Sequence, residues 1–267
     1  MTAFETLTKA IILAAGRGTR LQLLTELRPK PLVEVNGVSI LCNALAQLQA
    51  VGVTEVTIVV GYRKHAIQYA IGAHYGAMAV RYIESERFAE TGSAYSLWLA
   101  RSELLSGSLF LLEGDIVFER AVLDRLVSDP ATDVAAVAIF DHRMQGSAVL
   151  LDGERRIIEL RTGQTAADLH EDRPVLFKTI NLFRFGAATL RDHLLPELDA
   201  QHAAGGTNLY LEQILQQLIE QGRLDLTAVH CGDLKWYEID SPDDLSIAEA
   251  IFGTHERSQR NDGKGCR

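Results

Sequence analysis

The stretch that decides the fold is residues 9–32, KAIILAAGRGTRLQLLTELRPKPL. It begins with an apolar run, Lys9 to Ala15, which is typical of a buried strand. The glycine turn Gly16-Arg17-Gly18 follows at once, and such a turn can bring backbone amides close to a polyphosphate. Arg17, Arg20 and Lys30 add positive charge there. We therefore predict a phosphate-binding loop after the first strand, although a tight turn with surface arginines is the simpler alternative.

Two common phosphate motifs do not fit this loop. The dinucleotide-binding fingerprint needs a third glycine where this chain has Leu21. A P-loop closes with Gly-Lys-Ser or Gly-Lys-Thr, and Gly18-Thr19-Arg20 does not supply that ending. The sequence thus disfavours a nicotinamide enzyme and an ATPase.

The pattern beyond the loop predicts an α/β fold, because apolar runs alternate with helical patterns in the first half. Further strands are expected at residues 55–60, 79–83, 109–113, 133–140, 177–185 and 236–239. Helices are expected at residues 40–51, 94–104, 120–128, 187–203, 208–221 and 242–252. After residue 140 the turn Asp152-Gly153 predicts an antiparallel hairpin. We expect a mixed, mostly parallel sheet between two helical layers, with an antiparallel elaboration in the second half.

Composition limits what the chain can bind. It has 267 residues, of which 47% are hydrophobic and 23% charged, as in ordinary globular domains. Its 26 basic and 35 acidic residues give a net charge of -9, which argues against nucleic acid or an anionic membrane as a partner. No apolar run approaches the ~20 residues that span a bilayer. The three cysteines are too scattered for a disulfide framework, so we expect a cytoplasmic protein.

The segment from Leu13 to Leu32 resembles the signature of the nucleotidyltransferases. These enzymes join a nucleoside triphosphate to a sugar phosphate, phosphocholine or a phosphonate and release pyrophosphate. Two further segments, SAYSL at 93–97 and YEIDS at 237–241, make the likeness closest to the bacterial phosphocholine and phosphonate cytidylyltransferases. The resemblance extends from Lys9 to Phe252 and implies a Rossmann-like fold.

The resemblance also implies a division of the chain. We expect one nucleotidyltransferase domain at residues 1–252, with a nucleotide-binding half at about 9–140 and an acceptor-binding half at about 141–252. A polar tail is expected at 253–267. The antiparallel second half could supply a dimer surface, so a homodimer is a further expectation.

Two aspartates follow apolar strands, Asp115 after 109–113 and Asp240 after 236–239. Ligands of open α/β sheets bind beyond the carboxyl ends of the strands. Mg²⁺ usually takes one or two protein carboxylates together with phosphate oxygens. We therefore expect both aspartates to hold Mg²⁺, as the resemblance also implies. A turn residue at 115 and a helix start at 240 are the simpler alternatives.

Residue chemistry and the resemblance together suggest the remaining roles. Arg20, Lys30 and Lys178 are expected to be catalytic, with Lys178 on the acceptor unless it only lies on a sheet edge. The nucleotide is expected to meet Leu13, Ala14, Ala15, Gly16, Arg17, Gly18, Thr19, Gly92, Ser93 and Gly114. A small cationic acceptor could be held by aromatic rings and carboxylates. Its expected contacts are Lys178, Asn181, Tyr210, Glu212, Trp236 and Glu238.

The resemblance, together with these residues, implies CMP transfer from CTP to a small phosphate or phosphonate of the phosphocholine or 2-aminoethylphosphonate type. Because the acceptor dianion is already a nucleophile, positioning and charge stabilisation suffice for catalysis. Two alternatives stay open. One is a sugar 1-phosphate nucleotidyltransferase that uses another triphosphate, and the other is a non-catalytic nucleotide-binding protein of the same fold.

Overall fold

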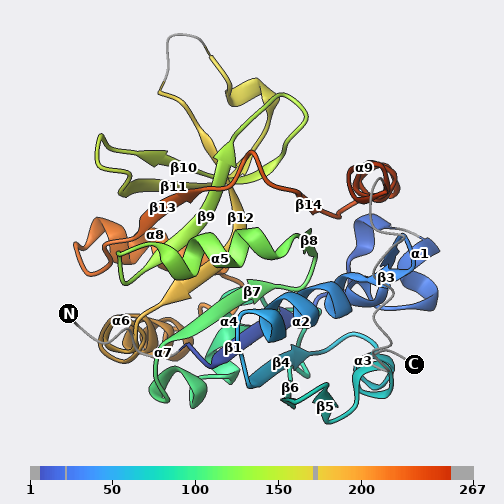
Figure 1. Cartoon of the computed structure of the whole chain (residues 1–267). Coiled ribbons are helices and arrows are strands. Elements are labelled where there is room, and N and C mark those ends of the chain that lie inside the picture. Colours follow the sequence, from blue (N-terminus) through green and yellow to red (C-terminus); the bar gives the residue numbers. More distant parts are fainter. Residues whose placement is uncertain (1–6, 22, 171–173, 254–267) are drawn as a thin grey trace.

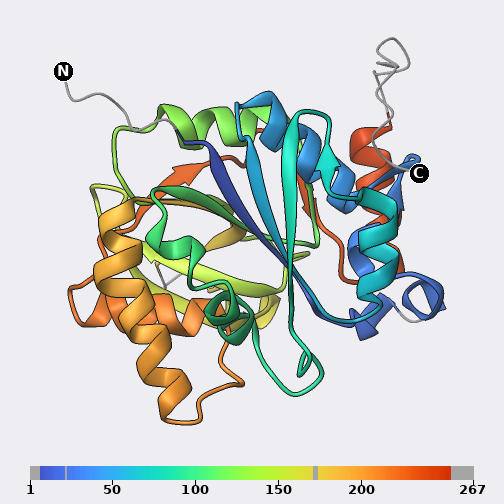
Figure 2. The same cartoon turned by 90° about the horizontal axis from the view of Figure 1, so that it is seen from below.

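The computed structural model describes residues 7–21, 23–170 and 174–253. A central sheet separates two layers of helices, as Figures 1 and 2 show. This arrangement confirms the predicted three-layer α/β sandwich with a mixed sheet. The polar tail predicted at 253–267 lies, except for Gly253, outside the described residues.

The parallel part of the sheet consists of β1 (Lys9–Ala14), β4 (Glu55–Val60), β6 (Met78–Glu84) and β7 (Leu109–Glu113). β1 lies between β4 and β7, and β4 pairs with β6 on its other side. Most residues of β1, β4 and β7 are buried, as continuous apolar strands covered on both faces should be. Their carboxyl ends meet at one edge of the sheet.

The antiparallel part is built on β12 (Phe177–Phe185), which pairs with β7 and with β9 (Val134–Ile139). The predicted hairpin is confirmed as β10 (Gly146–Leu151) and β11 (Ile157–Gln164). A further strand, β13 (Thr227–His230), runs parallel to β9.

β12 contains a bulge between Thr179 and Phe183. Thr179 pairs with Val137 and Phe183 with Ala135, so β12 has extra residues between these two pairs. Asn181 lies inside this irregularity with a φ of 54°, a left-handed conformation that asparagine tolerates better than most residues. The bulge therefore turns the strand locally at Asn181.

The helices divide between the two faces of the sheet, as Figure 2 shows. α2 (Ile40–Ala50), α3 (Lys64–Ile71) and α5 (Arg120–Ser128) share one hydrophobic core, and α4 (Ser93–Leu99), α7 (Leu195–Ala203) and α8 (Leu211–Glu220) share the other. Within the described ranges, no helix combines the length and the apolar character that crossing a membrane requires.

Shorter elements complete the chain. They are α1 (Leu23–Leu27), β2 (Glu34–Val35), β3 (Val38–Ser39), β5 (His74–Tyr75), α6 (Ala187–Thr189), 3-10 turns at Thr19–Leu21, Lys30–Leu32, Glu103–Leu105 and Ala166–Asp168, and a π turn at Leu190–Leu194.

One small ladder brings two distant parts of the chain together. β8 (Ile116–Phe118) pairs antiparallel with β14 (Trp236–Glu238). Immediately beyond it, the Ile239 amide donates to the carbonyl oxygen of Asp115 at 2.9 Å. α9 (Pro242–Phe252) then begins after Ser241, whose hydroxyl accepts from the Asp244 amide. The ladder and the cap thereby fix Asp240 beside Asp115.

Some predicted elements differ from the structure. The helix expected at 94–104 ends at Leu99, and residues 103–105 form a separate turn. α3 was missed because its first flanking residue, Arg63, has a left-handed φ of 49° and supplies no side-chain cap. The helix expected at 187–203 contains a π turn just before Pro196, whose nitrogen cannot donate a helical hydrogen bond.

Candidate active site

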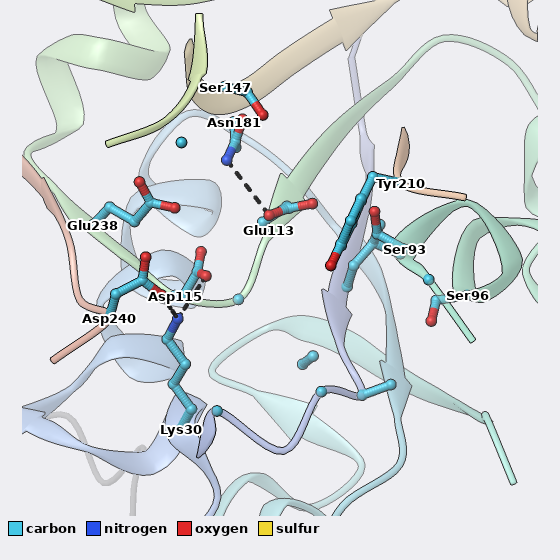
Figure 3. A pocket seen from close by; sticks show the side chains of 18 of the residues that line it. Lys30, Ser93, Ser96, Glu113, Asp115, Ser147, Asn181, Tyr210, Glu238 and Asp240 are labelled. Carbon is cyan, nitrogen blue, oxygen red and sulfur yellow. Dashed lines mark hydrogen bonds and ion pairs between the residues drawn. The ribbon is translucent and has the colours of Figure 1, made fainter. Parts of the chain in front are cut away.

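A cavity of about 600 Å³ opens at the carboxyl ends of β1 and β7, where an open α/β sheet binds its ligands. Figure 3 shows part of its lining. Most of the predicted site residues lie on its wall. They are Leu13, Ala14, Ala15, Gly16, Gly18, Thr19, Arg20, Lys30, Gly92, Ser93, Gly114, Asp115, Asn181, Tyr210, Glu212, Glu238 and Asp240.

Contacts with two segments fix the glycine loop and the end of β1 before it. One segment contains Thr25 and Lys30, and the other contains Gly114. Gly18 has a φ of 65°, and a Cβ there would lie 2.8 Å from the Cβ of Lys30. The Thr25 hydroxyl donates to the Gly18 carbonyl at 3.1 Å. On the other side, the Gly114 amide donates to the Leu13 carbonyl at 2.9 Å. The loop therefore packs directly against the stem of Lys30.

Lys30 lies between the two predicted metal ligands (Figure 3). Its ammonium donates to Asp115 Oδ2 at 2.8 Å and to Asp240 Oδ1 at 2.7 Å. Arg20 forms a second ion pair with Asp240 at 2.8 Å. Burial alone would lower the pKa of Lys30, but the charges of Asp115 and Asp240 more than offset it, so its pKa lies above the ordinary value.

Three carboxylates in this part of the cavity can share one cation. Asp115, Glu238 and Asp240 each offer an oxygen, and these oxygens lie within 4.8 Å of one another. Asp115 Oδ1 is buried and has no hydrogen-bond partner among the described residues. Burial raises the pKa of Glu238, which Lys178 offsets only in part. The donor set suits a hard divalent cation, which prefers oxygen ligands.

Lys178 lies behind the cavity wall rather than on it. Its side chain is 3% exposed, and its ammonium pairs with Glu238 Oε2 at 2.7 Å. Gly146, with a φ of 111°, covers it, and a Cβ there would lie 2.9 Å from the ammonium nitrogen. Lys178 can therefore affect the cavity through Glu238, whereas its own ammonium is not among the lining groups.

Two other predicted residues also lie off the cavity wall. The guanidinium of Arg17 lies over the ring of Tyr62, 5.6 Å from its centroid. Trp236 packs against the core on the α2 and α5 face. An arginine in a glycine loop and an aromatic residue in a final strand suggest a ligand contact, but strand register and neighbouring rings decide where such side chains point.

Sequence reasoning missed several lining residues. They are Pro31, Phe88, Thr91, Ser96, Glu113, Gly146, Ser147, Thr162 and Gly163. The position of Glu113 could have been predicted from the sequence, because this residue ends β7 immediately before Gly114 and Asp115. The residues of β10 and β11 follow no recognisable motif, and only the folding of this hairpin over the sheet brings them to the cavity.

Gly92 is needed for a close approach within the protein itself. A Cβ at this position would lie 2.1 Å from the carbonyl oxygen of Leu209. The Gly92 amide donates to the Thr207 carbonyl at 2.9 Å, and the Ala94 amide to Leu209 at 3.2 Å. The predicted contact of Gly92 with the nucleotide stays a prediction, and within the protein the nearest atoms belong to the segment before α8.

Substituting alanine at Gly92 is expected to lower the free energy of unfolding by about 1–3 kcal/mol, because the backbone at Leu209 must move. Urea denaturation would measure the change. Gly153→Ala is the matched control, since a Cβ at Gly153 meets nothing within 4 Å and should change stability by less than about 0.5 kcal/mol. Equal stability of the two variants would contradict the steric explanation.

Comparison with known proteins identifies the family. Residues 10–224 match the family model of the MobA-like NTP transferase domain. The chain belongs to this family. The predicted membership among the nucleotidyltransferases is thereby confirmed.

Two curated relatives are similar to this chain over most of its length. CMP-5'-(3-aminopropyl)phosphonate synthase of Streptomyces rubellomurinus is 35% identical over 255 residues, which cover 94% of this chain and 40% of the synthase. Choline-phosphate cytidylyltransferase of Streptococcus pneumoniae is 37% identical over 245 residues, covering 91% of this chain and 98% of the relative. The chain spans less than half of the synthase and about half of several other relatives.

A solved structure agrees with the transferase fold. The CTP:phosphocholine cytidylyltransferase from Streptococcus pneumoniae matches with a TM-score of 0.75 at 23% identity, over 91% of this chain and 98% of that chain. This likeness confirms the predicted Rossmann-like fold.

Proposed function

We propose that this chain transfers CMP from CTP to a small phosphate or phosphonate with release of pyrophosphate. The observation that carries the proposal is the position of Lys30, which bonds Asp115 and Asp240 beside the glycine loop. A triphosphate placed there would find positive charge, loop amides and metal-binding carboxylates together. The names of the two relatives support cytidine as the base.

The proposed reaction needs no general base. An oxygen of the acceptor dianion attacks the α-phosphorus of CTP in line, and a new P–O bond forms. The bond between the α-phosphorus and the bridging oxygen breaks, and its electron pair leaves with pyrophosphate. Arg20 and the loop amides would hold the β- and γ-phosphates, and Lys30 would stabilise charge at the α-phosphate.

Mg²⁺ fits the carboxylates of the cavity. Asp115 and Asp240 are its proposed ligands, and Glu238 offers a third oxygen within reach. The unpartnered Oδ1 of Asp115 is the observation that favours a bound cation. When bound, the ion would neutralise negative charge on the triphosphate.

Several finer predictions remain proposals. We keep Lys178 as a residue that acts on the acceptor, although its ammonium pairs with Glu238 in the structure. The division into a nucleotide-binding and an acceptor-binding half, the homodimer and the cytoplasmic location also remain proposals.

A substrate panel tests the proposed function. The four ribonucleoside triphosphates are each combined with phosphocholine, 2-aminoethylphosphonate or glucose 1-phosphate, and pyrophosphate release is measured. We expect kcat/KM for CTP to exceed that for UTP by at least about tenfold, with a nitrogen-bearing acceptor. Turnover only with glucose 1-phosphate would instead favour the sugar nucleotidyltransferase. Triphosphate binding without any turnover would favour the non-catalytic alternative.

A further inference from the structure

Glu212 is a buried carboxylate on the cavity wall that lacks part of its bonding. It lies in the first turn of α8 and is 6% exposed. Its Oε1 accepts from the Ser147 hydroxyl at 2.8 Å. Its Oε2 is buried and has no hydrogen-bond partner among the described residues. A buried oxygen of this kind calls for a donor, and the cavity is the place from which a ligand can supply one.

Glu113 is the second carboxylate of this part of the cavity. It ends β7, and the amide of Asn181 donates to its Oε2 only at 3.5 Å. Figure 3 shows Glu113 beside Asn181, with Asp115 between this group and Lys30. The negative charges of Glu113 and Glu212 act on each other across the cavity. Within the described residues neither glutamate forms an ion pair, so a cationic ligand would relieve their mutual repulsion.

The aromatic residues of the cavity are few. Phe88 and Tyr210 are the aromatic side chains among its described lining residues. Tyr95 and Trp98 instead pack against His202, with ring centroids at 5.7 and 3.5 Å. A trimethylammonium group is recognised mainly by aromatic faces, because it has no N–H to donate. A primary ammonium has three donors and is recognised by carboxylate and hydroxyl oxygens.

We infer that Glu212, together with Glu113, binds a primary ammonium group of the acceptor. The transferase then selects an aminoalkyl phosphate or phosphonate over its trimethylammonium counterpart. This inference rests on the proposed function and names the acceptor class for the same cavity. Glu212 is the specificity-determining residue, because its Oε2 can accept a hydrogen bond from a primary ammonium, whereas a trimethylated nitrogen has no N–H to donate.

The first test uses the wild-type protein with CTP. Phosphoethanolamine, its mono-, di- and trimethylated forms and 2-aminoethylphosphonate are compared by kcat/KM for pyrophosphate release. We expect a decline with each methyl group, reaching at least about tenfold for phosphocholine. Comparing 2-aminoethylphosphonate with phosphoethanolamine shows whether the enzyme prefers a phosphonate or a phosphate ester. Equal rates across the methylation series would overturn the inference.

The second test uses Glu212→Gln, which keeps the side-chain shape. We expect kcat/KM for the primary ammonium acceptors to decrease about 10- to 100-fold, because a charge-assisted hydrogen bond is lost. Phosphocholine turnover should decrease less than this, because its trimethylammonium group loses electrostatic attraction but no hydrogen bond, and the KM for CTP should change by less than about threefold. Glu220→Gln is the matched control, an exposed residue of the same helix, and should leave all acceptors unchanged.

Equal losses for all acceptors in Glu212→Gln would contradict a role in selectivity. Isothermal titration calorimetry separates this inference from the proposed function. If no acceptor gives pyrophosphate, the proposed function fails, yet phosphoethanolamine, which differs from phosphocholine only in methylation, should still bind at least about tenfold more tightly than phosphocholine. Equal binding of the two would overturn the inference itself. The wild-type comparisons hold even if the variant does not fold.

Discussion

Replacing Asp240 with asparagine is expected to lower the rate of pyrophosphate release roughly 10²- to 10³-fold, a loss comparable to that of one oxyanion donor. Asp240 Oδ1 accepts from Lys30 and pairs with Arg20. Asparagine preserves the shape but removes the charge that positions both cations and that would hold Mg²⁺. The loss should appear mainly in kcat, because charge builds at the phosphates in the transition state.

Steady-state pyrophosphate release from CTP and the best acceptor would measure this loss. Asp243→Asn is the matched control, since Asp243 is an exposed residue of α9 three positions away. It should retain nearly full activity. Asp115→Asn should behave like Asp240→Asn, and circular dichroism should show that each variant is folded. Near-normal turnover in either site variant would contradict the metal assignment.

The parallel strands and the glycine loop were predictable because both depend on local patterns. β1, β4 and β7 are continuous apolar runs, buried on both faces. The rule that ligands bind beyond the carboxyl ends of strands was enough to pair Asp115 with Asp240. The ladder that joins them was not predictable, because β8 has three residues and directly follows the Gly114-Asp115 turn.

Side-chain directions in the second half were not predictable, because they depend on register and bulges. Asn181 lies in a bulge of β12 with a φ of 54°. No local sequence motif predicts this bulge. The sequence predicted that the ring of Trp236 contacts the acceptor, but in the structure Trp236 packs against the core. The sequence predicted that Lys178 contacts the acceptor. In the structure Gly146 leaves room for its side chain beneath β10, where its ammonium pairs with Glu238. The sequence thus indicated the right segments without the orientation of each residue.

Replacing Lys30 with methionine is expected to have two opposite effects. Pyrophosphate release should decrease about 10³-fold, because no ammonium remains to stabilise charge at the α-phosphate. Binding of Mn²⁺ in the absence of nucleotide should strengthen by at least about tenfold. The reason is that the Lys30 ammonium lies 2.8 and 2.7 Å from oxygens of Asp115 and Asp240, where it repels a second cation.

Electron paramagnetic resonance of free Mn²⁺ measures the binding without relying on turnover. Lys235→Met is the matched control, because Lys235 is exposed and outside the cavity, and it should change neither quantity. If Lys30→Met binds Mn²⁺ no more tightly than the wild type, the ammonium does not compete with the metal. If the expected gain is found, Lys30 must leave the carboxylates when the metal enters, and the triphosphate offers it new anionic partners at that moment. Metal and nucleotide would then bind cooperatively, because each removes the obstacle to the other.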